Sequence, residues 1–500
     1  MLLNTCISDD FAAMLRSLPR LDANALIAAL DTEPCVSIRL NRHKFPADSD
    51  GTPIADAGYT GTTPVGWCAD GRYLPERPNF TLNPLFHAGA FYVQDASSMI
   101  HQQLTERLSA LLGGKPLSLL DFCAAPGGKT TAMINALPRG SVVTANEYTP
   151  SRGKILRENL EKWGYPAVIT TGASADEYAR LPEIFDIIAV DAPCSGEGMM
   201  RKDEEARRQW SPALTERCAE LQREILKNIA TTLRPGGYLI YSTCTFNLEE
   251  DELNAAFIRD VLMLEPVDPA SLGLEGIQGL SGPLLPDVCG LRFMQHLNSG
   301  EGLFVSIFHR PGKASTYFDS ISSPHRQEIF SPAADVCASK HEKSAKKGKR
   351  NSAGSDITID APSAGILRNW IDPQWEMAFE RSGNIMTAIP ANAGSILAAL
   401  RKEHIRVTGA GLPIAEIKGR DLIPDSRIVL SEAFNINAFP SLPLTLEESL
   451  RYLRREAIQL PPDTPKGFVT VTYAGLPLGI MKNLGNRANN LFPAPWRIRI

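Results

Sequence analysis

Two short apolar runs, each leading to a cysteine, constrain the fold of this chain more than any other feature. The run Ile-Ile-Ala-Val at 187–190 precedes Asp191 and Cys194, and the run Tyr-Leu-Ile-Tyr at 238–241 precedes Cys244. Runs of this length and composition are typical of buried strands. Because reactive groups in an open parallel α/β sheet lie beyond the carboxyl ends of its strands, neighbouring strands would place these three side chains in one crevice.

The region before these runs alternates strands with helices. Strands are predicted at 117–121, 141–145 and 167–170, and helices at 129–135 and 152–163. This alternation, continued to Cys244, predicts a doubly wound α/β sheet. A closing hairpin is predicted from residues 291–294 and 302–308. The acids at 249–252 are interpreted as the first turn of a helix, where the helix dipole favours negative charge.

Composition sets the class of protein. The chain has 500 residues, 43% hydrophobic and 21% charged, which predicts several globular domains. It has no apolar run long enough for a membrane span and no basic region before an N-terminal apolar run, so we expect a cytoplasmic protein without membrane contacts. Its nine cysteines form no Cys-x-x-Cys pair and lie near no suitably spaced His, which argues against disulfides and against a metal site.

The chain divides into five predicted units. These are an N-terminal α+β accessory unit at 1–85, a catalytic α/β domain at 86–311, a flexible linker at 312–362 with six basic residues from Lys340 to Arg350, a small β-rich module at 363–445 and a second β-rich module at 446–500. The N-terminal unit carries a basic cluster, which we interpret either as a phosphate contact or as a solvated face: Arg39, Arg42, His43 and Lys44.

The last two units share a faint repeat. Ala-Gly-Leu-Pro occurs at 410–413 and again at 474–477, and each copy continues as an apolar run ending in Lys. This repeat predicts two β-rich modules joined by a helix at 446–458. The alternative interpretation is a chance similarity. Residues 451–500 hold eight Lys and Arg against Glu456 and Asp463, a net charge of +6 in a chain of net charge -5. A basic end suggests a local anionic partner, and the interleaved Tyr473, Phe492 and Trp496 predict stacking in addition to phosphate contacts.

A glycine-rich turn at 123–130 follows the first strand of the catalytic domain. Its glycines allow a ligand to approach the backbone, and Glu147, after the next strand, is suited to accept hydrogen bonds from two ribose hydroxyls. This combination predicts an adenosine-type cofactor. The alternatives are a turn without a ligand and a phosphate-binding P-loop ending in Gly128-Lys129-Thr130. The P-loop pattern fails because Cys123 occupies the position of its first glycine.

The two cysteines suit covalent chemistry on a cytosine. A thiolate that adds to carbon 6 converts the ring into an enamine, and carbon 5 can then attack an electrophilic methyl group. The reaction also needs an acid or hydrogen-bond donor at N3, for which Asp191 in protonated form is suited, and a second thiol or a positioned water for elimination. Either cysteine alone would more simply be a small buried hydrophobe, but two at parallel strand ends favour the functional interpretation.

Three motifs resemble those of the Sun-type RNA cytosine-C5 methyltransferases: Asp-Phe-Cys-Ala-Ala-Pro-Gly-Gly-Lys-Thr-Thr at 121–131, Asp-Ala-Pro-Cys-Ser-Gly-Glu-Gly at 191–198 and Tyr-Ser-Thr-Cys-Thr at 241–245. The resemblance implies that Cys244 is the nucleophile, that Cys194 helps to release the product and that Asp191 is the active-site aspartate, which also contacts the cofactor. It further implies an S-adenosylmethionine loop and a ribose-binding acid, Glu147. The loop comprises Cys123, Ala124, Ala125, Pro126, Gly127, Gly128 and Lys129.

The tail resembles the PUA-type RNA-binding end of the RsmF kind, which acts on bacterial small-subunit ribosomal RNA. The similarity lies in residues 471–479, Lys482 and 485–487. One position departs from the family pattern, because the usual adenine-binding aspartate is replaced by Ser174, with Asp176 displaced by two residues. Either side chain would make that contact.

The resemblance implies a Rossmann-like, S-adenosylmethionine-dependent enzyme that makes 5-methylcytosine in ribosomal RNA, with the 16S RNA of the small subunit as its partner. We expect a monomer. The alternative from another class is an RNA-binding ribosome-assembly factor without catalytic activity.

Overall fold

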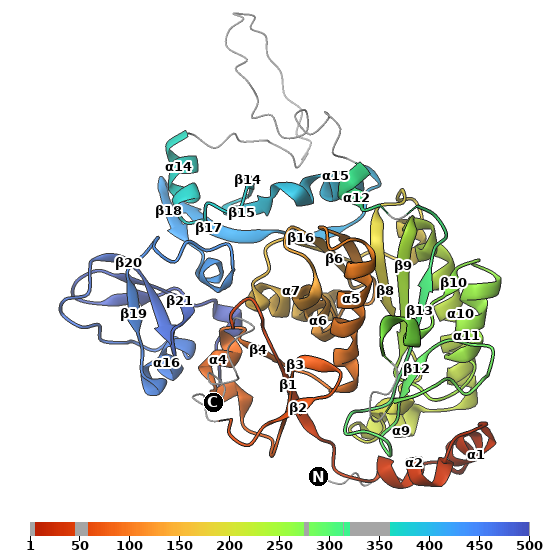
Figure 1. The fold of residues 1–500 in the computed structure, drawn as a ribbon. Helices are drawn as coiled ribbons and strands as arrows, with labels where there is room; N and C mark the ends of the chain where they lie inside the picture. Colours follow the sequence, from red (N-terminus) through yellow and green to blue (C-terminus); the bar gives the residue numbers. More distant parts are fainter. Residues whose placement is uncertain (1–5, 46–58, 275–279, 314, 321–360, 500) are drawn as a thin grey trace, which may run out of the picture.

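The structure, a computed structural model, describes residues 6–45, 59–274, 280–313, 315–320 and 361–499. Its largest sheet has ten strands, and three four-stranded sheets surround it (Figure 1). One of these comes from the N-terminal part of the chain and two come from the C-terminal part. Most of the predicted linker, including Lys340 to Arg350, lies outside the described residues.

Five parallel strands form the core of the large sheet: β5 (Ser118–Asp121), β6 (Val142–Asn146), β7 (Val168–Thr171), β8 (Phe185–Asp191) and β9 (Leu233–Thr243). Their spatial order is β9-β8-β5-β6-β7. The chain therefore builds outward from β5 to β7 and then returns to the other side of β5. Most residues of these strands are buried, as expected for parallel strands covered on both faces. The reversal between β5 and β8 is where sheets of this kind bind ligands.

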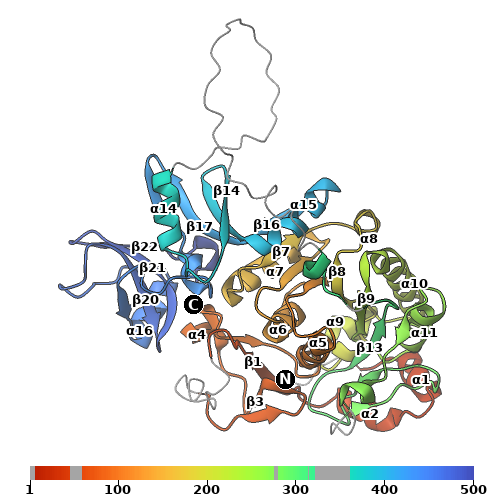
Figure 2. The ribbon, with the colours of Figure 1, turned by 45° about the horizontal axis from the view of Figure 1, so that its top comes forward.

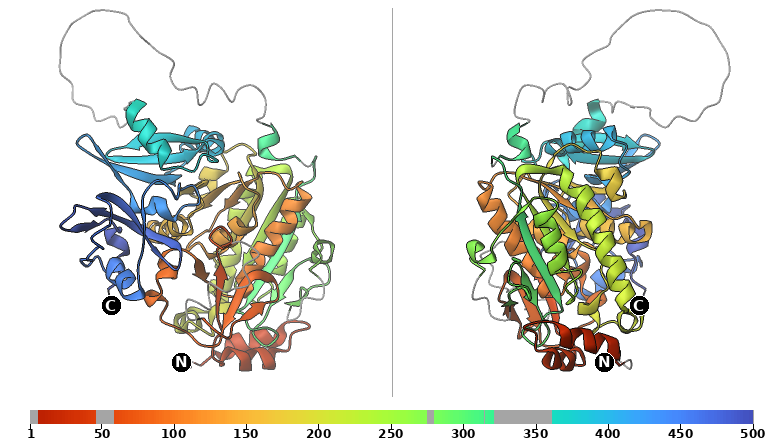
Figure 3. Two further views of the ribbon diagram at one scale, coloured as in Figure 1. Left: turned by 60° about the vertical axis from the view of Figure 1, so that its left-hand side comes forward. Right: turned by 90° about the vertical axis from the view of Figure 1, so that its right-hand side faces the viewer.

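Helices cover both faces of this sheet. They are α5 (Ile100–Leu111), α6 (Gly128–Ala136), α7 (Pro150–Trp163), α10 (Pro212–Ile229) and α11 (Glu252–Asp260). The right-hand view of Figure 3 shows the sheet between orange helices on one side and yellow-green helices on the other. The predicted doubly wound, Rossmann-like fold is thus confirmed. Among the residues that the structure describes, no helix is long and apolar enough to cross a membrane.

The predicted closing hairpin is also present. It consists of β12 (Leu291–Phe293) and β13 (Leu303–His309), which pair antiparallel, and β13 pairs antiparallel with β9. Two short strands, β10 (Glu265–Pro266) and β11 (Leu280–Ser281), add to this edge. The strand that ends at the second motif cysteine, β9, is therefore flanked on both sides and held in the interior of the sheet.

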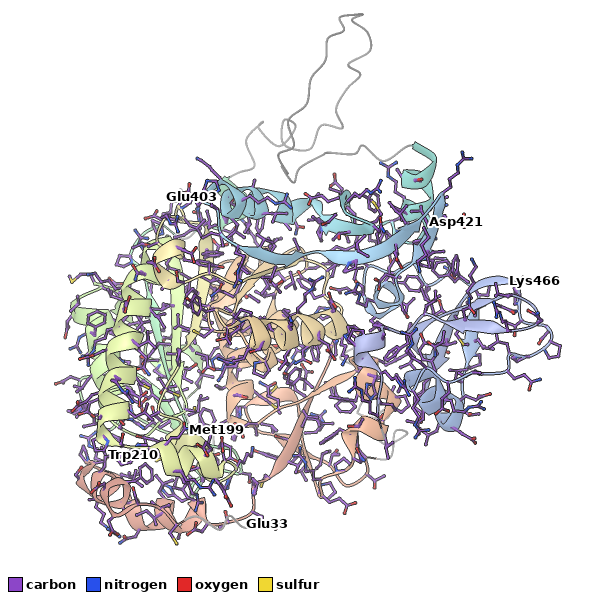
Figure 4. All side chains as sticks on the ribbon, turned by 180° about the vertical axis from the view of Figure 1, so that it is seen from behind. Glu33, Met199, Trp210, Glu403, Asp421 and Lys466 are labelled. Carbon is purple, nitrogen blue, oxygen red and sulfur yellow. The ribbon has the colours of Figure 1, made fainter. Side chains whose placement is uncertain are left out.

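The N-terminal part forms two separate contacts with the catalytic part. Its strands β1 (Val36–Leu40), β2 (Thr63–Val65), β3 (Cys68–Leu74) and β4 (Phe91–Val93) make one sheet, with the short helix α4 (Pro84–His87) beside it. Its first helices, α1 (Asp9–Ser17) and α2 (Ala23–Leu30), pack instead on catalytic-domain residues that include Met200, Trp210 and Phe246. Figure 4 shows Trp210 just above these helices.

The basic cluster of the N-terminal unit contacts the catalytic domain. For Arg39 both interpretations from the sequence, a phosphate contact and a solvated face, are wrong. The Arg39 side chain is fully buried. Its guanidinium donates to the backbone oxygen and the hydroxyl of Thr131 on α6 and lies over the ring of Trp163 on α7. Lys44 is partly buried and donates to the carbonyls of Ala88 and Lys162. The sequence did not reveal these partners because they are distant along the chain: Thr131 lies 92 residues after Arg39, and Ala88 and Lys162 lie 44 and 118 residues after Lys44.

The C-terminal part contains two sheets that lie side by side (Figure 2). The first contains β14 (Met377–Ser382), β15 (Ile385–Pro390), β17 (Leu412–Lys418) and β18 (Asp421–Pro424), and the second contains β19 (Ser441–Pro443), β20 (Gly467–Tyr473), β21 (Leu476–Asn483) and β22 (Ala488–Asn490). Strand β16 (Val407–Ala410) lies between β15 and β17 in the sequence but does not join their sheet. It pairs antiparallel with β7 of the large sheet instead. The C-terminal region thus completes the edge of the catalytic sheet.

The sequence repeat corresponds to a repeated backbone. Gly411 and Gly475 both have positive φ, +67° and +79°, which L side chains rarely adopt. After each, a proline lies opposite a threonine at a β-bulge, with Pro413 opposite Thr387 and Pro477 opposite Thr472. The prediction that the helix at 446–458 joins two modules is wrong, however. Helix α16 (Leu446–Leu453) follows β19 and so lies within the second sheet's unit, and one hydrophobic core spans both sheets.

Two of the three aromatic residues predicted to stack on RNA are in that core. Phe492 is 1% exposed and Trp496 is 8% exposed. Tyr473 is partly buried and packs against the core of the N-terminal unit. The aromatic and basic residues alternate because the former face the core and the latter face outward. The stacking prediction is therefore wrong for Phe492 and Trp496.

Candidate active site

The glycine-rich turn connects β5 to α6 at the reversal of the sheet. Gly127 has φ +109° and precedes Gly128, the first residue of α6. The hydroxyl of Thr130 donates to Asp121 at 2.6 Å, which fixes the helix to the end of β5. Burial raises the pKa of Asp121 to about 7. Because neither glycine carries a Cβ, the turn can present bare backbone to a ligand.

Glu147 follows β6 and lies beside this turn, since the Ala124 backbone donates to the carbonyl of Asn146 at 2.9 Å. The Glu147 side chain is 5% exposed. One of its oxygens accepts the Thr149 backbone N–H at 2.8 Å, and the other lies 3.4 Å from Arg152. A carboxylate has about four acceptor positions, so capacity for further hydrogen bonds remains. This is the arrangement that a ribose-binding acid requires.

The structure brings the two motif cysteines together. Strands β8 and β9 are parallel neighbours with Asp191 opposite Ser242, and the sulfur atoms of Cys194 and Cys244, in the loops that follow, are 3.0 Å apart. The hydrogen bond with Cys244, together with burial, raises the pKa of Cys194 well above its usual value. Cys194 therefore remains a thiol, whose S–H can donate to the sulfur of Cys244.

Asp191 joins the cysteine pair to the cofactor turn. Its Oδ2 lies 2.6 Å from the ammonium of Lys129, and its Oδ1 accepts from the hydroxyl of Ser242 at 2.9 Å. Burial by itself would lower the pKa of Lys129, but the nearby Asp191 carboxylate outweighs it and the pKa is raised. The site thus combines a cation, a carboxylate and two sulfur atoms at the ends of three adjacent strands.

Two buried carboxylates that the sequence analysis missed hold the cysteine loops. Glu197, three residues after Cys194, accepts the backbone N–H groups of Phe246 and Asn247 just beyond Cys244. In return Glu250, on the Cys244 side, accepts the backbone N–H and hydroxyl of Ser195. Each loop therefore supplies the acid that fixes the other. Burial raises the pKa of Glu250 to about 7.

Of the acids at 249–252, which the sequence suggested as the first turn of a helix, only Glu252 lies in that turn. Helix α11 starts at Glu252. Asp251 precedes it and accepts from Thr245 at 2.7 Å while pairing with the buried Arg292 at 2.9 Å. Only the clustering of three acids beside the cysteine motif hinted at this role, and a helix N-terminus explains such clustering equally well.

The two candidates for the adenine contact differ in their surroundings. Ser174 is the N-cap of α8 (Ala175–Tyr178), and its backbone N–H and hydroxyl donate to Glu177 at 2.8 and 2.9 Å. Asp176 lies in the first turn of this helix with an exposed side chain. Both positions are near the end of β7, and the choice between them stays a prediction. Among the described residues, no group of three or more His, Cys, Asp or Glu side chains is arranged to hold a metal ion.

Comparison with known families divides the chain into three matched regions. Residues 114–309 match the family described as 16S rRNA methyltransferase RsmB/F. Residues 7–96 match the N-terminal domain of 16S rRNA methyltransferase RsmF, and residues 439–498 match the methyltransferase RsmF PUA domain. The last match includes β19, ahead of residue 446.

Similar proteins match over nearly the full length. The ribosomal RNA small subunit methyltransferase F of Enterobacter sp. (strain 638) is 30% identical over 500 residues, covering 97% of this chain and 95% of the relative. The protein of that name from Escherichia coli O7:K1 is 30% identical over 467 residues, covering 91% and 89%. Among solved structures, a methyltransferase homolog protein from Pyrococcus horikoshii has a TM-score of 0.50 at 26% identity, covering 61% of this chain and 95% of the other. The structure of NSun6 from Pyrococcus horikoshii with SFG, at 18% identity and a TM-score of 0.52 over 62% and 99%, shows the same fold.

Proposed function

Because this chain belongs to the RsmF family of 16S rRNA methyltransferases, we propose that it methylates carbon 5 of one cytosine in small-subunit ribosomal RNA through a covalent cysteine–RNA intermediate. The enzyme is a ribosomal RNA methyltransferase that uses S-adenosylmethionine. This cofactor supplies the electrophilic methyl group.

The observation that carries the proposal is the cysteine pair at the reversal of the sheet. Cys244 forms the bond to carbon 6 of the ring, which makes carbon 5 nucleophilic. The Cys194 thiol, 3.0 Å from the Cys244 sulfur, acts after methyl transfer, when the carbon 5 proton must leave and the bond to Cys244 must break. Asp191 faces the same space and stabilises the added electron pair by hydrogen bonding at N3.

Residues of this chain fit the cofactor. The turn from Cys123 to Lys129 offers bare backbone at Gly127 and Gly128, and Glu147 keeps acceptor capacity for two ribose hydroxyls. Lys129 and Asp191 form the boundary between this side and the cysteine side. We assign the turn, Glu147 and Asp191 to cofactor binding on these grounds.

The second C-terminal unit provides RNA affinity. Lys466, just before β20, and Arg487, just after β21, lie on its exposed surface at the open end of this hairpin, away from its turn, and Figure 4 shows Lys466 on the outer edge of the molecule. Exposed cations of this kind contact phosphates independently of sequence. The catalytic unit then selects the base, which must leave its stack to reach the cysteines.

The test uses two matched single substitutions at the pair, Cys244→Ala and Cys194→Ala, with ribosomal RNA and labelled cofactor. Cys244→Ala should neither attach to RNA nor transfer the methyl group. Cys194→Ala should transfer it but fail to eliminate, so that protein linked to methylated RNA accumulates on a denaturing gel.

Three other outcomes would change the assignment. An adduct with Cys244→Ala and none with Cys194→Ala would reverse the roles of the cysteines. Normal methylation by both variants would exclude the covalent mechanism. No methyl transfer by the unmodified enzyme to any ribosomal RNA, with RNA binding intact, would favour the alternative of an assembly factor without catalytic activity.

A further inference from the structure

A small cavity of about 180 Å³ lies where the N-terminal unit packs on the catalytic domain. We call it the aromatic pocket. Its main wall residues come from α4, β4 and the end of α7: Phe86, Phe91, Tyr92, Asn159, Lys162 and Trp163. Phe86, Tyr92, Asn159 and Lys162 are partly exposed, so the pocket opens to the surface of the protein.

The size and the walls of the aromatic pocket indicate what it can hold. Sites for drug-sized ligands have volumes of about 300–1,000 Å³, so this smaller cavity suits a single ring system. The rings of Tyr92 and Trp163 meet edge to face with their centroids 6.5 Å apart, and those of Phe86 and Phe91 lie 5.9 Å apart. Aromatic walls of this kind hold unstacked bases in proteins that bind single-stranded RNA.

Asn159 gives the aromatic pocket a hydrogen-bond acceptor. Its side-chain nitrogen donates to the carbonyl of Pro126 at 2.8 Å and to the hydroxyl of Tyr92 at 3.2 Å. These two bonds fix the orientation of the amide, and none of the residues that the structure describes donates to its oxygen, Oδ1. That oxygen can therefore accept from an N–H group at the edge of a base.

The position of the aromatic pocket also points to RNA. The bond from Asn159 to Pro126 joins it to the cofactor turn. On the other side, the ammonium of Lys162 lies 5.0 Å from the centre of the Trp496 ring in the second C-terminal unit, and Trp496 is followed by the exposed Arg497. Figure 1 shows α4 between β4 and α16 of that unit. RNA that reaches from the second C-terminal unit to the cofactor therefore passes close to this pocket.

We propose that the aromatic pocket binds one unstacked base of the ribosomal RNA substrate, at a nucleotide other than the target. The base stacks on Tyr92 and donates to Asn159 Oδ1, and Arg497 supplies positive charge for the RNA backbone. Phosphate contacts carry no sequence information, whereas a second captured base fixes which nucleotide reaches the cysteines. The inference rests on the proposed function for its RNA substrate, but it does not need the covalent cysteine mechanism.

The first test measures affinity for 16S ribosomal RNA by filter binding, with S-adenosylhomocysteine present and excess transfer RNA as competitor. Tyr92→Ala should raise the Kd by about tenfold, the order of magnitude that the stacking of one base contributes. Tyr92→Phe keeps the ring and should bind nearly as well as the unmodified enzyme. Tyr238→Ala, at a partly exposed tyrosine of β9 outside the pocket, is the matched control. An unchanged Kd in Tyr92→Ala would overturn the proposal.

The second test locates the base. Ultraviolet irradiation of the complex should crosslink one nucleotide of the RNA to residues 86–93 or 159–163, as identified by mass spectrometry. An RNA that lacks the base at that nucleotide should bind the unmodified enzyme and Tyr92→Ala equally, because the same contact is already lost. If Tyr92 only supported the cofactor turn, Tyr92→Ala would bind this RNA more weakly as well. That result, or no crosslink in these two segments, would overturn the proposal.

A blocking variant keeps the test decisive if Tyr92→Ala does not fold. Val93 also lines the pocket and is partly exposed, so Val93→Trp should fill the cavity and lower RNA affinity while cofactor affinity and melting temperature stay unchanged. Undiminished RNA affinity in this folded variant would refute the assignment. Because binding and crosslinking need no methyl transfer, an enzyme that failed to methylate cytosine would contradict the proposed function alone, and the crosslink would still decide the present inference.

Discussion

Glu147→Ala should weaken cofactor binding by about tenfold. The Glu147 side chain is 5% exposed, so its hydrogen bonds to a ligand are shielded from water. A hydrogen bond to a charged group contributes about 1.5–3 kcal/mol. One oxygen of Glu147 is partly used by the Thr149 backbone at 2.8 Å, which favours the lower end, and about 1.4 kcal/mol corresponds to tenfold in Kd.

The assay is calorimetry with two ligands, S-adenosylhomocysteine and its 2′,3′-dideoxyribose counterpart. The unmodified enzyme should bind the second ligand more weakly, whereas Glu147→Ala should bind both with nearly equal affinity. This comparison of two proteins with two ligands separates the contact between carboxylate and ribose from any effect of the substitution on the start of α7.

Equal losses of affinity for both ligands in Glu147→Ala would mean that the residue acts by supporting the local backbone. Unchanged affinity for the ribose-containing ligand would place the ribose elsewhere. Either outcome refutes the assignment of Glu147 as the ribose-binding acid.

Three further predictions concern RNA binding, pH and packing. Replacing Lys466 and Arg487 by Glu should lower RNA affinity and reduce its salt dependence without affecting cofactor affinity; an unchanged salt slope in filter-binding assays would exclude these phosphate contacts. Since folded Asp121 has a pKa of about 7, the folded state keeps a proton that the unfolded chain loses near pH 4. The unfolding free energy should therefore decrease by about 1.4 kcal/mol per pH unit between about pH 4 and 7. Asp121→Asn should flatten this dependence in denaturant titrations, and parallel curves for both proteins would contradict it. Gly198→Ala should destabilise by about 1–3 kcal/mol, because a Cβ there would lie 2.5 Å from the carbonyl oxygen of Gly302. Gly282→Ala, where nothing lies within 4 Å, is the matched control, and equal denaturation midpoints for the two variants would disprove the clash.

The catalytic part could be predicted because its information is local. The apolar run of a buried strand can be recognised from the sequence of that strand alone. The residue that follows the run lies at the carboxyl end of the strand, wherever the strand is placed in the sheet. Asp191, Cys194 and Cys244 therefore needed only neighbouring strands to meet, and β8 and β9 are neighbours. Glu147 follows from the same rule at the end of β6.

Other features depend on partners far away in the sequence. Arg39 looks like a surface cation until α6, about 90 residues later, covers it. Glu250 and Asp251 have the pattern of a helix start, and only the folded loops reveal what they bind. Phe492 and Trp496 alternate with basic residues, but that alternation does not indicate which face is buried.

The pairing of β16 with β7 determines when the catalytic sheet can be completed during synthesis of the protein. Strand β7 ends at Thr171 and β16 begins at Val407, so 407 − 171 = 236 residues must be made before the two can meet. At about 5–20 residues per second, the catalytic sheet leaves the ribosome with an open edge for roughly 10–50 s. Unpaired edges of this kind recruit other strands. Chains truncated before Val407 should consequently aggregate during expression even though every catalytic residue is present, and coexpressed chaperones should rescue them more than they rescue the complete chain.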